Sequence, residues 1–573
     1  MDTKEMIKEV ENKDSAKRVK KPGTAATIVL CVLFFLGAAL IAGSIWYSFT
    51  FNIGFKEMLY TIFFSPLKGT DSNIVWGALK LCLPPVIAAT VIYVVVFLSS
   101  RSYLAKHPDT EAMKEYDAAK KETGKKSGKE TSGPSFTKEE KKIRRNKLVR
   151  WLCVILGIAI FIGAVIGAFI SMDIYPYLKS ITDTTKIYDE EYVKPDLSKI
   201  TADGKTKNLI YIYLESMETT YASTQDGGHN DVNYMAGMTD LARKNLTFTD
   251  KSGGLLGGFR NPEGTRWTIA AILATTSGIP FSFPVQRNSM SKRETFAPGL
   301  TNLGDILEAK GYEQEFLCGS DAEFGGRKNL FTQHGNYKIF DLFSAREKGY
   351  IAPDYKVWWG YEDEILYKIA KDELTELASH DKPFNFTMLT VDTHHIDGYV
   401  CRLCKNEYDS VTANVVSCAD RQLVRFVRWI KEQDFFKDTV VIITGDHPRM
   451  ETNLVEGVDY DDRTIYNCFI NVDESIVKGE TENRSYTPMD MFPTILEAMG
   501  FDVEGDRLGL GTSMFSTMPT LAERYGKEIA AEKEKEGEPI TEEEANLLGY
   551  QKLNEEVAKY SDFYDNFSKE SFK

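Results

Sequence analysis

The amino-acid sequence predicts an α/β protein with transmembrane helices at its N-terminus, followed by a domain with a central, mostly parallel sheet flanked by helices. Two observations carry this prediction. Three apolar runs near the N-terminus each exceed the roughly 20 residues that cross a bilayer. After them, short apolar runs alternate with amphipathic stretches, as they do where parallel strands are joined by crossover helices. A chain of 573 residues is long enough to form both parts.

The three apolar runs predict transmembrane helices at residues 25–49, 76–98 and 151–172. The second run contains Pro84 and Pro85, which a membrane helix tolerates as a kink. A cleaved signal peptide does not fit, because the first run is too long and two more follow it.

Charge predicts the orientation of these helices. Seven Lys and Arg residues precede the first run and fifteen lie in the loop 101–150, whereas the loop 50–75 has only Lys56 and Lys68. Because positively charged loops stay on the cytoplasmic side, the N-terminal tail and the loop 101–150 are expected inside. The third helix would then carry everything after Met172 to the outside. The prediction is a multi-pass protein of the bacterial cell membrane with an extracytoplasmic domain.

The charge of the two parts indicates their partners. The basic stretch 120–129 has few apolar residues and is expected to be disordered beside anionic lipid. Of the 69 basic and 83 acidic residues, 25 and 15 lie within the first 172, which leaves 44 basic and 68 acidic residues outside. A domain this acidic is a poor nucleic-acid binder. We therefore expect the membrane, and no nucleic acid, as a partner.

Five of the eight cysteines follow the apolar runs. Cys401 and Cys404 have the spacing of half a zinc site, but no second pair follows at zinc-finger spacing. In an extracellular domain, one or two disulfides among Cys401, Cys404 and Cys418 are favoured over zinc, with the pairing left open. The odd count leaves one thiol over, and Cys318 or Cys468 is expected in a core.

Four short apolar runs in the second part read as buried strands, at 208–214, 315–318, 384–391 and 439–444, and helical patterns fall at 238–245, 303–310 and 420–433. Three of the strands run into polar clusters. They end, respectively, at Glu215, at Asp392-Thr393-His394-His395 and at Gly445-Asp446-His447.

These clusters predict a metal site. The carboxyl ends of parallel strands share one edge of a sheet, and ligands bind there. Glu215, Asp446 and His447 supply two carboxylates and an imidazole, which suit Mn²⁺ or Zn²⁺. Taken singly, each has a plainer explanation, because an Asp after a strand is usually a turn residue and Glu215 could cap a helix. Taken together, they favour metal binding.

Thr268 is the candidate nucleophile. It opens an apolar, Ala-rich segment that reads as a buried helix, and the first turn of a helix favours a bound anion. A helix cap is the commoner role for such a threonine. A metal-bound hydroxyl, however, loses its proton more easily and can attack a phosphate or sulfate ester.

Three further side chains could assist that chemistry. His394 or His395 could protonate the leaving oxygen or hold the ester, and a structural, hydrogen-bonded histidine is the alternative for each. Arg327 could grip a phosphoryl group through two hydrogen bonds, and a surface arginine is the alternative.

The motifs, in their order along the chain, resemble those of the phosphoglycerol transferases of the alkaline phosphatase/sulfatase superfamily, which include lipoteichoic acid synthase and the enzyme that decorates osmoregulated periplasmic glucans. The forms Trp267-Thr268-Ile269-Ala270 and Asp392-Thr393-His394-His395 are more similar to the glucan enzyme. The resemblance extends from the membrane spans to about Gly511. Its motifs are Leu214-Glu215-Ser216, Gly264-Thr265-Arg266-Trp267-Thr268, Gly319-Ser320-Asp321 with Gly326-Arg327, Asp392 to His395, and Thr444-Gly445-Asp446-His447.

The resemblance implies a role for each candidate residue. Thr268 would be the nucleophile, and one divalent metal ion would be held by Glu215, Thr268, Asp446 and His447. Mn²⁺ is the expected ion, with Mg²⁺ and Zn²⁺ as alternatives. The remaining roles are substrate binding by His394 with His395 as its partner, and phosphoryl contact by Arg327.

The sequence also departs from related patterns. Gly325 stands where lipoteichoic acid synthase has a tryptophan, so the glycerol contacts are expected to differ. The sulfatase Cys/Ser-x-Pro-x-Arg motif is absent, which argues against sulfate esters. A second set of metal ligands is absent as well, which argues against a multi-zinc phosphatase.

The expected organisation has four parts. A membrane domain with three transmembrane helices and a basic cytoplasmic loop spans 1–172, a linker 173–206, an alkaline-phosphatase/sulfatase-like catalytic domain 207–517, and a charged helical extension, solvated by default, 518–573.

The expected function is that of a metal-dependent phosphoglycerol transferase of the cell envelope. It would move glycerophosphate from phosphatidylglycerol to an envelope glycan, glycolipid or polyglycerophosphate acceptor through a phospho-threonine intermediate. The alternatives are a phosphoethanolamine transferase or phosphodiesterase of the same superfamily, and a non-catalytic envelope protein that binds lipid or glycan.

Overall fold

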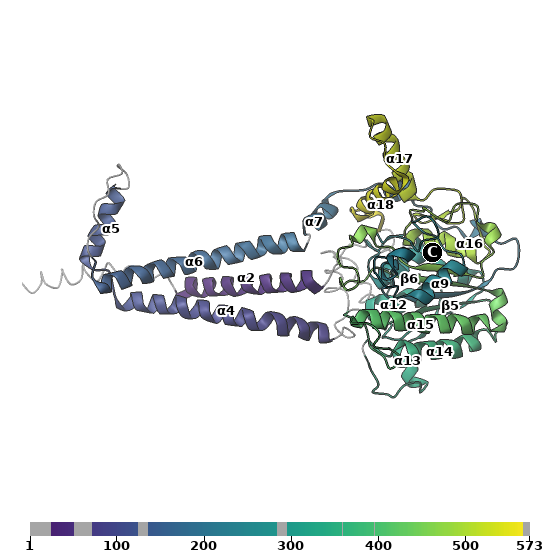
Figure 1. Cartoon of the computed structure of the whole chain (residues 1–573), viewed down its shortest axis with the longest axis horizontal. Coiled ribbons are helices and arrows are strands. Elements are labelled where there is room, and N and C mark those ends of the chain that lie inside the picture. Colours follow the sequence, from purple (N-terminus) through teal and green to yellow (C-terminus); the bar gives the residue numbers. More distant parts are fainter. Residues whose placement is uncertain are drawn as a thin grey trace, which may run out of the picture. The chain divides into compact units, whose positions relative to one another are not determined.

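The structure, a computed structural model, describes residues 24–50, 72–123, 136–172, 174–282, 295–357, 359–394 and 396–564. It has mixed α/β architecture, with three long apolar helices and a mostly parallel central sheet (Figure 1). The chain divides into two compact units, one containing the long helices and the other containing the sheet. The predicted fold class is confirmed.

The first unit contains three helices that are long and apolar enough to cross a membrane, as predicted. They are α2 (Thr24–Thr50), α4 (Ser72–Lys106) and α6 (Lys138–Ser171). A shorter helix, α5 (Glu111–Thr123), lies in the basic loop, and the rest of the stretch expected to be disordered is outside the described residues. Helix α4 continues through Pro84 and Pro85, as a membrane helix can.

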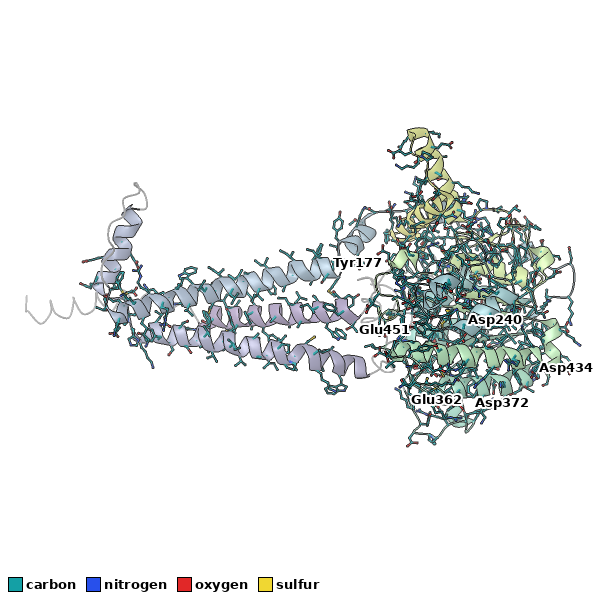
Figure 2. The ribbon with its side chains drawn as sticks, in the orientation of Figure 1. Tyr177, Asp240, Glu362, Asp372, Asp434 and Glu451 are labelled. Carbon is teal, nitrogen blue, oxygen red and sulfur yellow. The ribbon has the colours of Figure 1, made fainter. Side chains whose placement is uncertain are left out.

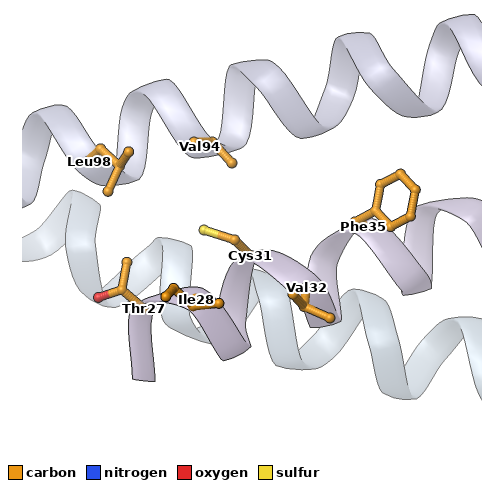
Figure 3. Close-up of a pocket in the computed structure, with 7 residues that line it drawn as sticks. All are labelled: Thr27, Ile28, Cys31, Val32, Phe35, Val94 and Leu98. Atoms are coloured by element: carbon orange, nitrogen blue, oxygen red, sulfur yellow. The ribbon is translucent and has the colours of Figure 1, made fainter. Parts of the chain in front are cut away.

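Contacts of one tyrosine join the three long helices. The ring of Tyr93 in α4 stacks on Phe34 of α2 with centroids 4.0 Å apart, and its hydroxyl donates to the Cys153 carbonyl of α6 at 2.9 Å. Apolar side chains such as Ile92 and Trp151 face outward from these helices, which suits a hydrocarbon environment. Figure 3 shows a pocket on α2 and α4, lined by Thr27, Ile28, Cys31, Val32, Phe35, Val94 and Leu98.

The second unit is built on a six-stranded sheet with the strand order β4-β3-β5-β2-β6-β7. All neighbours pair in parallel except β7, which is antiparallel to β6. The strands are β2 (Asn208–Leu214), β3 (Glu313–Cys318), β4 (Lys338–Phe340), β5 (Phe384–Leu389), β6 (Thr439–Gly445) and β7 (Asn467–Ile470). The four predicted strands are thus present, and the short edge strands β4 and β7 are additional.

Helices cover both faces of this sheet, as the alternation in β2 shows. Its odd-numbered residues Leu209, Tyr211 and Tyr213 belong to one hydrophobic core, and its even-numbered residues Ile210, Ile212 and Leu214 belong to another. The first core receives α10 (Thr268–Ser277), α11 (Leu303–Ala309), α16 (Met491–Ala498) and the C-terminal helices. The second receives α9 (Ala236–Lys244), α14 (Asp363–Leu377) and α15 (Val411–Lys431).

Smaller elements complete the second unit. The helices are α7 (Ile174–Thr182), α8 (Ile187–Glu191), α12 (Arg327–Gln333) and α13 (Leu342–Glu347), and the short strands are β1 (Ile200–Thr201), β8 (Asp502–Val503), β9 (Arg507–Leu508) and β10 (Gly511–Thr512). The segment expected to be a linker is therefore partly folded onto the domain, because β1 pairs with β8 and Ile187, Tyr188 and Ile200 are buried in its core.

The C-terminal extension is helical, as predicted, but the structure corrects the expectation that it is solvated throughout. Helices α17 (Leu521–Glu536) and α18 (Glu542–Ala558) both begin with a capping box. A side chain at Gly549 would collide with the backbone of Ala522 and Gly526, so glycine lets the two helices pack closely. One face of α18 is buried in the first core through Tyr550, Leu553 and Val557.

This packing predicts that Leu553→Ala destabilises the second unit. Removing a buried leucine leaves a cavity and costs about 2–5 kcal/mol of unfolding free energy. Lys552→Ala, one residue away and half exposed, should change it by less than about 0.5 kcal/mol. Urea unfolding of the purified full chain, followed by tryptophan fluorescence, measures both. Equal, small effects would mean that α18 is a solvated appendage after all.

Candidate functional site

The carboxyl edge of the sheet brings three predicted ligands together. In the β2–β6 pairing, Leu214 lies opposite Gly445, so the residues that follow, Glu215 and Asp446, leave the sheet side by side. His447 comes next in the chain. Ligand atoms of the three residues lie within 4.8 Å of one another, and all three side chains are buried.

Thr268 reaches this cluster from the start of α10. Its hydroxyl donates to Glu215 Oε2 at 3.2 Å and lies 3.5 Å from His447 Nε2. Thr268 is the first residue of the helix, and the N-cap residue is Trp267, whose side chain makes no capping hydrogen bond. The capping role that could explain a threonine here therefore does not apply, and its hydroxyl faces the acidic cluster.

The ring of His447 is oriented by the backbone. Its Nδ1 lies 2.8 Å from the Pro448 carbonyl oxygen, which can only accept, so Nδ1 carries a hydrogen. The other nitrogen, Nε2, then faces the carboxylates, 3.6 Å from Glu215 Oε1 and 3.5 Å from Asp446 Oδ2. An imidazole held in this way presents a lone pair at Nε2 for a metal ion.

Burial and mutual repulsion affect the pKa values of the two carboxyl groups, Glu215 and Asp446. Burial and then the charge of Glu215 raise the pKa of Asp446 to about 7. Burial acts on Glu215 in the same direction, but the charges of His394 and His447 and hydrogen bonds from Ser216 and Thr268 outweigh it, so the pKa of Glu215 is lowered. Without a cation, Asp446 therefore takes up a proton at a higher pH than Glu215 does.

The donor set fits a divalent metal ion. Asp446 Oδ1 accepts hydrogen bonds from the backbone amides of Ser216 and His447, both at 2.8 Å. Asp446 Oδ2, although buried, accepts none from the described residues. An unsatisfied carboxylate oxygen beside a second carboxylate and an imidazole nitrogen is costly alone and favourable around Mn²⁺ or Zn²⁺.

The backbone is strained at Ser216, the residue after Glu215. Ser216 has a φ of 52°, in the left-handed region that residues with a side chain rarely occupy. Its amide reaches Asp446 Oδ1, and its hydroxyl donates to Glu215 Oε1 at 2.7 Å. The strained turn thus fixes both carboxylates, as strained residues often do at functional sites.

A buried ion-pair network, which sequence reasoning missed, supports the site from behind. Arg463 Nε donates to Glu218 Oε2 at 2.8 Å, and the Arg449 amide donates to the other oxygen of Glu218 at 3.0 Å. Both arginines are fully buried. The network links the turn after β2 to the segment after β6. Nothing in the sequence marks an arginine 17 residues after Asp446 as a partner of Glu218.

The remaining predicted residues lie around this centre. The ring of His394 lies 4.3 Å from that of Trp359 between centroids, and its charge acts on Glu215. Arg327 is buried and donates to Ser320 Oγ at 3.0 Å and to the Asp321 carbonyl at 2.8 Å. His395 lies outside the described residues.

The described hydrogen bonds of Arg327 do not reach the acidic cluster. Its described hydrogen bonds all go to its own loop, including one from Nε to the Phe324 carbonyl at 3.1 Å. The neighbouring Gly325 packs close to Ile269, the residue after Thr268. The loop that carries Arg327 is therefore adjacent to the start of α10.

A family model described as Sulfatase matches residues 207–501, just over half of the chain. The chain belongs to the sulfatase family, and the resemblance based on its motifs is confirmed. Its curated relatives include phosphoglycerol transferase I of Escherichia coli (strain SMS-3-5 / SECEC), 31% identical over 370 residues that make up 62% of this chain and 45% of that protein. The enzyme of the same name from Shigella boydii serotype 18 has the same identity and coverage. This chain spans less than half the length of these relatives.

Three solved structures illustrate the structural neighbours. A protein of the alkaline phosphatase superfamily from Vibrio parahaemolyticus is 23% identical, with a TM-score of 0.43, over 58% of this chain and 76% of that one. The lipoteichoic acid synthase LtaP from Listeria monocytogenes is 18% identical, with a TM-score of 0.44, over 58% and 80%. The phosphoethanolamine transferase EptA from Neisseria meningitidis is 16% identical, with a TM-score of 0.44, over 84% and 85%.

The crowding of charge predicts that Asp446→Asn stabilises the metal-free protein. Above pH 7, where Asp446 is ionised, the amide removes one buried negative charge and keeps an acceptor for the two backbone amides, so we expect a gain of about 1–3 kcal/mol in chelator at about pH 8.5. Added Mn²⁺ should then stabilise the unsubstituted chain and have little effect on the variant.

Thermal unfolding of the full chain, with and without chelator, provides the measurement. Asp240→Asn is the matched control, because Asp240, labelled in Figure 2, is exposed and its ion pair among the described residues is with Lys244 of the same helix. A metal-free Asp446→Asn variant that unfolds at a lower temperature than the unsubstituted chain would contradict the prediction.

Proposed function

We propose that the chain is a membrane-anchored, metal-dependent transferase that moves glycerophosphate from phosphatidylglycerol to an envelope glycan, glycolipid or polyglycerophosphate acceptor. The observation that carries the proposal is the Thr268 hydroxyl at the first turn of α10, 3.2 Å from Glu215 Oε2 and 3.5 Å from His447 Nε2. The relatives named phosphoglycerol transferase I support the choice of the transferred group.

Glu215, Asp446 and His447, with the hydroxyl of Thr268, would hold one divalent ion in this proposal. Mn²⁺ suits two carboxylates and an imidazole, and Mg²⁺ and Zn²⁺ are the alternatives. When bound, the ion would act as a Lewis acid that favours the alkoxide of Thr268 and neutralises charge on the phosphoryl group.

The reaction proceeds in two displacements at phosphorus. Thr268 Oγ1 attacks the phosphodiester of phosphatidylglycerol, a P–O bond forms, and the P–O bond to diacylglycerol breaks. The hydroxyl proton of Thr268 passes to solvent, and His394 donates a proton to the departing diacylglycerol oxygen. The product is glycerophospho-threonine and free diacylglycerol.

In the second displacement an acceptor hydroxyl attacks the same phosphorus and gives its proton to His394. The P–O bond to Thr268 breaks, and Thr268 recovers a proton from solvent. The free amides at the start of α10 bind the nonbridging oxygens throughout. Arg327, from the adjacent segment, is assigned to the phosphoryl group, and His395 is assigned to the substrate as the partner of His394.

A lipid donor accounts for the membrane segments. The three apolar helices anchor the enzyme where its donor lies, and the positive charge of the flanking loops favours an extracytoplasmic catalytic domain. The organisation proposed is a membrane domain at 1–172, a partly folded linker at 173–206, a catalytic domain at 207–517 and a helical extension at 518–573.

Two other functions remain as rivals. A phosphoethanolamine transferase or phosphodiesterase of the same superfamily would use the same nucleophile on a different headgroup or pass it to water. A non-catalytic envelope protein would bind lipid or glycan without turnover. It would not need a hydroxyl next to a group of metal-binding side chains.

The donor and the nucleophile can be tested together. With the full chain in nanodiscs, headgroup-labelled phosphatidylglycerol should release diacylglycerol, and phosphatidylethanolamine should not. Intact-protein mass should show one added glycerophosphate in the absence of acceptor. Thr268→Ala should abolish both, with a loss of at least about 10³-fold in rate.

Thr276→Ala is the matched control, because Thr276 lies in the same helix and, among the described residues, its hydroxyl donates to the Ile272 and Leu273 carbonyls of that helix. It should keep the adduct and the activity. Turnover by Thr268→Ala would contradict the nucleophile assignment. Turnover of phosphatidylethanolamine alone would favour the phosphoethanolamine transferase. Lipid binding without turnover would favour the non-catalytic envelope protein.

Topology gives an independent test of the site's location. Lys125→Cys should resist an impermeant thiol reagent in intact cells, because the basic loop is expected in the cytoplasm. Glu536→Cys, at the exposed end of α17, should react. The unsubstituted chain, labelled in parallel, accounts for the native thiols. The reverse pattern would place the site in the cytoplasm and exclude an outer-leaflet donor.

A further inference from the structure

Three cysteines converge outside the proposed active site. Cys401 and Cys404 lie in the loop between β5 and α15, and Cys418 lies within α15. Cys401 Sγ is 3.7 Å from Cys404 Sγ and 3.7 Å from Cys418 Sγ, and all three sulfur atoms lie within 4.8 Å of one another. All three are free thiols, Cys401 and Cys418 being buried and Cys404 partly exposed.

The sulfur–sulfur distances distinguish two interpretations. A disulfide requires about 2.05 Å between sulfur atoms. Sulfur ligands about 2.3 Å from a tetrahedral zinc ion lie about 3.8 Å from one another. The observed 3.7 Å matches the second spacing. The disulfides that the sequence favoured are therefore not formed in the structure. Cys418 lies beside Cys401 and Cys404, so the possible zinc site has three cysteines instead of two.

The amide of Gln422 donates to two of the three sulfur atoms. Gln422, buried one turn after Cys418, points its Nε2 at Cys418 Sγ at 3.6 Å and at Cys401 Sγ at 4.0 Å. Such donors stabilise negative charge on sulfur, which a metal-bound thiolate carries and a disulfide does not.

We propose that Cys401, Cys404 and Cys418 bind one thiophilic divalent cation, of the Zn²⁺ class, in a structural site separate from the catalytic centre. The three thiols release their protons to solvent on binding, and a water molecule takes the fourth tetrahedral position. No change of oxidation state is involved. The partial exposure of Cys404 leaves a path by which the ion enters.

The bound cation would hold in place the loop that follows β5. Near its start, this loop is tied by the Tyr399 amide to the Asp392 carbonyl at 2.7 Å and by the Asp397 amide to Glu451 Oε1 at 3.1 Å. Glu451, labelled in Figure 2, also pairs with Arg449 at 2.8 Å. The cation would connect the same loop to α15, so that the segment beginning at His394 is held on both sides.

Cobalt substitution tests the proposal by a signal that the catalytic centre does not give. The full chain in detergent, freed of metal and loaded with Co²⁺, should show the near-ultraviolet charge-transfer absorption of cobalt thiolate. Cys404→Ser and Cys418→Ser should each lose most of it. Cys468→Ser should keep it, because Cys468 is a buried thiol in β7 outside the cluster. Glu215→Gln should also keep it, since the catalytic cluster has only oxygen and nitrogen ligands.

Two further measurements complete the test. The chain as purified should contain about one more zinc ion than Cys404→Ser. Unfolded without reductant, it should expose all eight thiols of the sequence. Six thiols would show one disulfide and overturn the proposal. Eight thiols with no cobalt–thiolate absorption would show that the sulfur atoms only pack together, and would overturn it as well. Thermal unfolding of each variant separates loss of metal from loss of fold.

Discussion

The parallel pairing of β2 with β6 is the constraint on which the rest of the site depends. It sets Leu214 opposite Gly445 and so delivers two carboxylates, Glu215 and Asp446, to neighbouring points of one buried edge. A slip of one residue would turn one of them to the other face of the sheet. Two adjacent buried carboxylates repel each other, and the strained turn at Ser216 holds them in place. The fold therefore stores unfavourable charge that a cation would neutralise.

Two buried ion pairs lie near that edge of the sheet. Behind the cluster, Arg463 and Glu218 form a buried pair that joins the segments after β2 and β6. Beside it, Arg449 and Glu451 hold the loop that leaves β5. A buried pair stabilises little by itself but is costly to break, so these residues contribute mainly to a single geometry. The cation proposed at Cys401, Cys404 and Cys418 would hold the other side of the same loop.

Sequence alone was sufficient for the apolar strands, the long helices and the polar residues at the strand ends, because these depend on local pattern and on the geometry of parallel sheets. It failed where partners are distant in sequence. The pairing of Glu218 with Arg463 spans 245 residues. The sequence grouped Cys418 with Cys401 and Cys404, but it did not place Cys418 within a helix. Helix α15 accordingly begins at Val411 rather than at the predicted 420. The burial of α18 was missed because its charged composition conceals one apolar stripe.

The contacts of α18 also bear on when the site can form as the protein is made. The Tyr550 hydroxyl donates to the Asn261 carbonyl, 289 residues earlier, and the Glu263 amide donates to Asn554, 291 residues later. The segment leading into Thr268 is thus secured by helix α18. Contacts this remote close slowly and late in folding. A nascent chain that still lacks α18 would lack both hydrogen bonds, so the segment before α10, and with it the proposed site, would take its final form only after α18 has been made.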